Sequence, residues 1–140
     1  MRTPPPKIFT VDELLSNLPY HSRTYTNGET AAVSDLSTVQ IQAPEGTTSI
    51  TLTMSYDVRI GLYSSNHLVI MDGAGDLVLE GRDADGAIVE SNSSNVLISG
   101  FKGNETDVTF VVPGNSVLIG ISSYSETSSA SYTITAIEIQ

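Results

Sequence analysis

Cysteine is absent from the 140-residue chain, and its absence removes several classes of chemistry. Without thiols there is no disulfide framework, no thiolate zinc site and no cysteine nucleophile. Tryptophan is also absent, and aromatic residues make up 6% of the sequence. No apolar run approaches the roughly 20 residues of a membrane-spanning helix. Residues 1–7 lack the apolar core of a signal peptide, so we expect synthesis in the cytoplasm without a signal.

Basic residues are scarce: Lys and Arg together number 6 against 16 Asp and Glu, which gives a net charge of −10. The six basic residues are dispersed along the chain and form no patch. A negative field of this size repels phosphate backbones and anionic membrane surfaces. We therefore expect no nucleic-acid partner and no membrane partner, and we interpret the acidity as a source of solubility.

The first 33 residues differ from the rest of the chain. Residues 4–6 are prolines, which favour an extended polyproline II start. Thr10 and Glu13 have the spacing of a capping box, and Pro19 ends the short helix that would follow. Residues 20–33 then predict a hairpin around Asn27-Gly28. These features predict an amino-terminal arm over residues 1–33, although the helix could instead cap one end of the following domain.

Residues 34–140 have the sequence pattern of a series of short β-strands. Hydrophobic residues alternate with Ser, Thr and other polar residues, and turn residues separate the alternating segments. Eight or nine short strands at this spacing predict an all-β fold, an antiparallel β-sandwich of the jelly-roll type. Residues 39–54 and 108–121 share one pattern of strand, Pro-Gly turn and strand. They could form two equivalent hairpins, or the likeness could be chance.

The usual catalytic and metal-binding patterns are missing. The two histidines, His21 and His67, lie in predicted strands, and no Gly-x-Ser-x-Gly elbow is present. The carboxylates lie mostly beside turns, where solvated acids are common. Asp83 and Asp85 lie in a turn that ends at Gly86, and the spacing fails the calcium-loop pattern. We predict no catalytic residues, no cofactor and no metal, although spacing leaves open whether Asp83 and Asp85 bind one.

Residues 109–123, TFVVPGNSVLIGISS, and residues 131–139, SYTITAIEI, resemble the carboxy-terminal strands of galactose-binding-like jelly rolls. This resemblance implies a fold found in carbohydrate-binding domains and in head-decoration and fibre proteins of tailed phages. It lies within residues 106–140, about a quarter of the chain, and no ligand-binding residue can be aligned. The missing tryptophan departs from typical sugar-binding members.

From these observations we expect a non-enzymatic virion protein, a phage head-decoration (cement) or small fibre component. Its arm would bind the major capsid protein or another virion protein, and copies would form a homo-oligomer, with a trimer favoured. The alternative is a carbohydrate-binding module that recognises a host surface or polysaccharide. The predicted partner-binding residues of the arm are Ile8, Phe9, Leu14, Leu15 and Leu18, and the predicted glycan contacts are Tyr56, Tyr63 and Tyr124.

Overall fold

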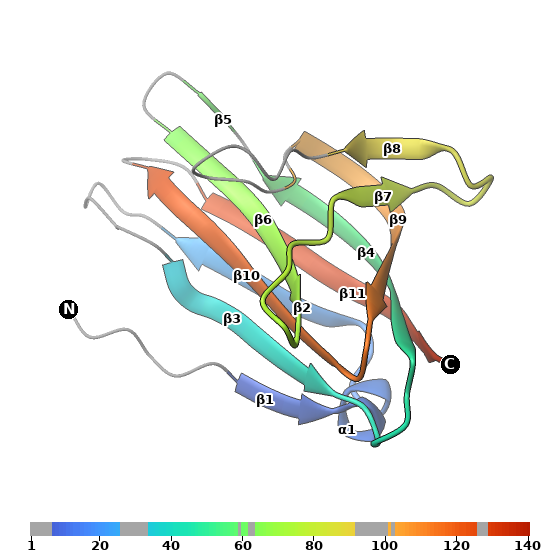
Figure 1. Cartoon of the computed structure of the whole chain (residues 1–140). Helices are drawn as coiled ribbons and strands as arrows, with labels where there is room; N and C mark the ends of the chain where they lie inside the picture. Colours follow the sequence, from blue (N-terminus) through green and yellow to red (C-terminus); the bar gives the residue numbers. More distant parts are fainter. Residues whose placement is uncertain are drawn as a thin grey trace.

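The chain folds as two β-sheets packed face to face, with one short helix at one end (Figure 1). A computed structural model describes residues 7–25, 34–58, 60–61, 64–91, 101, 103–125 and 129–140. The predicted all-β sandwich with a short amino-terminal helix is confirmed. In chain order the elements are β1 (Lys7–Thr10), α1 (Val11–Leu15), β2 (Tyr20–Tyr25), β3 (Ser34–Gln42), β4 (Ser49–Val58), β5 (Ile60–Gly61), β6 (Ser64–Asp72), β7 (Glu80–Arg82), β8 (Ile88–Ser91), β9 (Gly103–Pro113), β10 (Ser116–Ser125) and β11 (Ser129–Ile139).

One sheet has five strands in the order β1-β3-β10-β6-β5, and the other has six in the order β2-β11-β4-β9-β7-β8. Of the described strands, the nine from β3 to β11 lie in residues 34–140, in agreement with the eight or nine predicted there, and residues 7–25 add β1 and β2. All pairings are antiparallel except β1 with β3, which is parallel. The predicted strand that ends at Phe101 lies mostly outside the described residues. Within the described part of the chain, no helix is long and apolar enough to cross a membrane.

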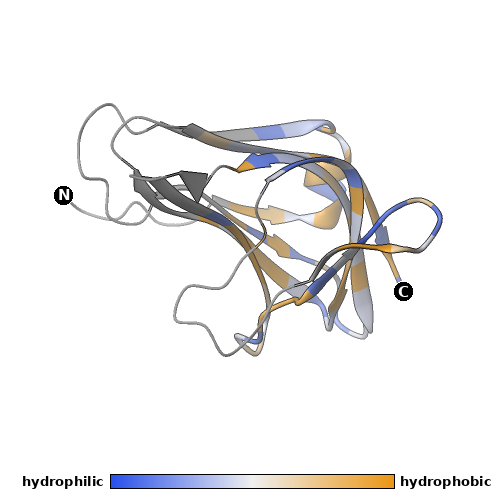
Figure 2. Ribbon diagram, turned by 90° about the horizontal axis from the view of Figure 1, so that it is seen from above, coloured by the Kyte–Doolittle hydropathy of each residue, from blue (hydrophilic) through white to orange (hydrophobic). Residues whose placement is uncertain are grey.

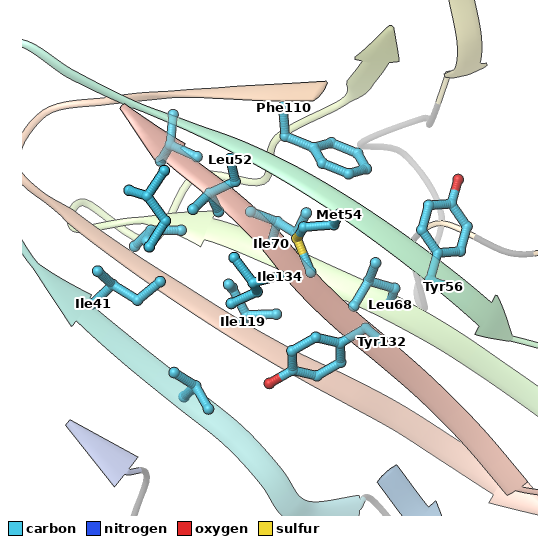
Figure 3. Close-up of a cluster of buried hydrophobic side chains, with 14 of the residues drawn as sticks. Ile41, Leu52, Met54, Tyr56, Leu68, Ile70, Phe110, Ile119, Tyr132 and Ile134 are labelled. Carbon is cyan, nitrogen blue, oxygen red and sulfur yellow. The ribbon is translucent and has the colours of Figure 1, made fainter. Parts of the chain in front are cut away.

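Period-two alternation sends every second side chain into the space between the sheets. In β4 the buried set is Ile50, Leu52, Met54, Tyr56 and Val58, and the residues between them are partly exposed. This alternation of hydrophobic and hydrophilic residues is visible along the strands in Figure 2. The buried side chains of both sheets point toward one another in the interior (Figure 3). Burial of this single apolar layer from both sides is the main source of stability.

The two segments with the shared strand, turn and strand pattern are corners of the sandwich and not hairpins. β3 and β10 lie in the five-stranded sheet, while β4 and β9 lie in the six-stranded sheet, so each turn carries the chain between sheets. The two turns are bonded to each other: the Ala43 amide donates to the Asn115 carbonyl at 2.8 Å, and the Gly114 amide donates to the Thr48 carbonyl at 2.7 Å. The two corners thus hold each other in register.

The described part of the predicted arm, residues 7–25, belongs to the sandwich. β1 pairs with β3, β2 pairs with β11, and α1 lies between them at one end of the sandwich (Figure 1). The predicted capping box is present, because the Thr10 hydroxyl accepts from the Glu13 amide at 3.1 Å and the Glu13 carboxylate accepts from the Thr10 amide. Leu14 is 0% exposed and joins the core. Residues 1–6 and 26–33, including the predicted Asn27-Gly28 turn, lie outside the described residues.

The docking of α1 can be tested with two neighbouring leucines. Leu14→Ala should lower the free energy of unfolding by about 2–5 kcal/mol, because it leaves a cavity in the core. Leu15→Ala is the matched control: Leu15 is 45% exposed, and its loss should change the stability by about 0.5 kcal/mol. Urea denaturation of both variants gives the two values. Equal, small effects would show that α1 does not pack on the sandwich.

Candidate functional site

The five predicted partner-binding residues divide into two groups. Ile8 on β1 and Leu15 on α1 are 65% and 45% exposed, so both can contact another molecule. Phe9 and Leu18 are half-buried against the core, and Leu14 is fully buried. The prediction that Leu14 binds a partner is therefore wrong, because its side chain is part of the protein's own interior.

Phe9 is held in place by an aromatic neighbour. Its ring meets Tyr20 of β2 edge-on, with the centroids 5.4 Å apart and the planes at 65°. Partial burial beside this contact raises the pKa of the Tyr20 hydroxyl above its usual 10.0. The pair joins the first strand of one sheet to the first strand of the other. Phe9 thus helps to close the sandwich.

Of the three predicted sugar contacts, the structure describes the side chain of one. Tyr56 is 3% exposed, and its ring lies 6.3 Å from the Phe110 ring inside the core (Figure 3). It cannot serve as a platform for a sugar, because the alternation of β4 turns it inward. Tyr63 and the side chain of Tyr124 lie outside what the structure describes. The glycan prediction therefore retains Tyr63 and Tyr124 alone.

The acidic turns use their carboxylates to order their own backbone. Asp83 Oδ1 accepts from the amides of Asp85 and Ala87 at 2.9 and 3.0 Å. Asp72 Oδ1 accepts in the same way from two amides of the following turn. Among the described residues, no three His, Asp or Glu side chains gather in a way that could hold a metal ion. The structure gives Asp83 a role in the turn, and Asp85 is exposed beside it.

The outer face of the five-stranded sheet is unusually free of charge for this protein. We call it the low-charge face, and none of its described outward-facing residues is Asp, Glu, Lys or Arg. By register, Ile8, Gln40, Leu118 and Met71 follow one another across four adjacent strands. Ile8 is exposed and the other three are partly exposed. The face comprises Ile8, Thr10, Gln40, Gln42, His67, Val69, Met71, Ser116, Leu118 and Gly120.

A groove lies where the connection from β6 to β7 passes the edge of β9. Its volume is about 470 Å³. One wall is the connection, with Leu77 and Leu79, and the other is the outward side of β9, with Thr109, Val111 and Pro113. No pattern in the sequence indicates this groove, because its two walls are far apart along the chain.

Comparison with known proteins identifies no relative: no protein-family model, curated protein or solved structure matches the chain. What the structure shares with the galactose-binding-like jelly rolls is therefore a sandwich of two sheets.

The structural role of the Asp83 carboxylate can be measured. Asp83→Ala removes the acceptor for two backbone amides and should lower the free energy of unfolding by about 1–2 kcal/mol. Asp85→Ala removes the same charge two residues later and should change it by about 0.5 kcal/mol or less. Thermal or urea unfolding gives both values. If Asp85→Ala is the more damaging change, the turn is not held by Asp83.

Proposed function

We propose that the chain is a non-enzymatic structural protein that works by joining an assembly, as a head-decoration or small fibre component of a virion. The low-charge face is the observation that carries the proposal. The proposal that this assembly is a virion rests on the resemblance of residues 109–123 and 131–139 to such modules. In this proposal the contact surface is a sheet face of the sandwich, with Ile8 at its edge, and not a detached arm.

The distribution of charge favours contact through this face. A body with a net charge of −10 repels its own copies, and the repulsion is strongest where carboxylates approach each other. No described carboxylate lies on the low-charge face, so a contact through this face places no described carboxylate against another copy. Its apolar members, among them Leu118, Met71 and Val69, together with Gln40 and Gln42, resemble an interface core with a polar surround. Copies of the same chain can therefore meet here at the least electrostatic cost.

Ile8 is the best single position for a test, because it is the most exposed large hydrophobic residue described and lies on an edge strand. Ile8→Glu should raise the dissociation constant of self-association at least tenfold, since a fully buried isoleucine contributes roughly 1.5–3 kcal/mol. Sedimentation velocity over a range of protein concentrations measures the change.

Ile88→Glu is the matched control, because Ile88 is 51% exposed on β8 of the other sheet. It adds the same charge and should leave self-association within about twofold of the parent protein. Thermal unfolding shows whether both variants are folded. A parent protein that stays monomeric at every concentration, or equal effects of the two substitutions, would contradict assembly through the low-charge face.

A further inference from the structure

β9 is paired along most of its length on one side, and on the other side it is paired over a much shorter stretch. β4 pairs with it along most of its length, up to Ser49 opposite Pro113. β7 pairs with it at one position, Arg82 opposite Thr109. Among the described residues, no strand pairs with β9 on that side between Thr109 and its end.

The register shows which backbone groups face the incomplete side. The Gly114 amide donates to Thr48 of the β4 side, and hydrogen-bonded positions recur at every second residue of an antiparallel pair. Val112 and Phe110, opposite Ile50 and Leu52, therefore direct their amides and carbonyls to β4. Val111 directs its amide and carbonyl the other way, into the groove. Its side chain is 57% exposed.

The connection between β6 and β7, which forms the second wall of the groove, is held by β6 of the five-stranded sheet. The Val78 amide donates to the Ile70 carbonyl of β6 at 2.8 Å, and Leu77 bridges to Met71. The chain reaches β9 only at Arg82, after Gly81, where a Cβ atom would lie 2.6 Å from Val108 Cγ1. The described part of the connection therefore makes no strand pairing with Val111, and both line the groove of about 470 Å³.

The groove is lined by apolar and charged residues and is acidic overall. Three carboxylates line it, from Asp72, Asp76 and Glu80, against one guanidinium, from Arg82. Arg82 is already engaged: it pairs with Glu80 at 3.0 Å and donates to the Gly86 carbonyl at 2.8 Å. The balance of charges in the groove is therefore negative, and Asp76 is exposed beside the apolar wall.

We propose that this groove binds a short extended segment of another protein that carries Lys or Arg. The segment adds a strand to β9 by pairing with the Val111 amide and carbonyl, in the manner of β-strand addition. Alternate side chains of the segment then pack on Leu77, Leu79 and Val111, and the basic side chains reach Asp76. Main-chain pairing supplies affinity, and the negative groove selects a basic partner. This binding site is separate from the low-charge face.

The experiment uses the full chain and a blocked peptide of about six residues that alternates Lys and Val. A second peptide has the same sequence with N-methylated amides along its pairing edge, so that charge and side chains are kept and strand pairing is lost. The unmethylated peptide should bind at least tenfold more tightly in a calorimetric titration, because several hydrogen bonds are lost together. Its binding should slow hydrogen exchange at the Val111 amide, which in the free protein should exchange faster than the Val112 amide.

Two variants locate the site. Asp76→Asn should weaken binding of the Lys-Val peptide about two- to fivefold, whereas Asp85→Asn, an equal change of charge on an exposed turn residue outside the groove, should leave it unchanged. Equal affinity for the two peptides, or protection that appears away from Val111, would overturn the proposal. A dimer of the chain that protects Val111 would overturn it as well, since a second copy would then be the occupant. Self-association through Ile8 is measured separately.

Discussion

The fold depends on the mutual bonding of its two sheet-crossing corners. Each corner sends one strand into each sheet, so antiparallel pairing of the two corners creates β3 with β10 and β4 with β9 at once. The amide of Ala43 and the amide of Gly114 each donate to the opposite corner. Every other strand is added beside these four. A slip of one residue at either corner would turn the core side chains of two strands outward.

The amino-terminal segment is the clearest consequence of this frame. β1 and β2 are added to different sheets, and the chain between them must therefore cross one end of the sandwich. A helix of five residues makes that crossing, with its capping box satisfying the first backbone amides and Leu14 filling the end of the core. A helix this short is stable because it is packed. The same geometry leaves Ile8 and Leu15 at the surface.

The connection between β6 and β7 produces the second notable surface. The connection is hydrogen-bonded to β6 at Val78, enters the other sheet at Glu80 and pairs with β9 at Arg82. Buried Gly81 allows β7 to approach Val108 and Phe110 closely. Among the described residues, part of β9 therefore has no strand partner on one side, and a groove lies beside it. The residues that line the groove are not those of the low-charge face, but the two surfaces meet at the end of β6, where Met71 belongs to the face and Asp72 to the groove. An acidic protein thereby has one surface suited to uncharged contacts and one suited to basic segments.

Composition and period-two alternation by themselves determined the all-β class, the buried set of strands such as β4, and the capping box at Thr10, because these depend on neighbours along the chain. The sequence pattern also found the two similar segments, but only the tertiary structure decided that they are corners, since the choice depends on which sheet each strand enters. Tyr56 and Leu14 were nevertheless predicted to contact a ligand or a partner, because an apolar or aromatic side chain on one face of an element can serve either the protein's own core or a binding surface. The groove and the low-charge face could not be predicted, because they bring together residues far apart along the chain, such as Asp76 and Val111 in the groove or Gln40 and Leu118 on the face, and only the tertiary structure decides which of these lie close.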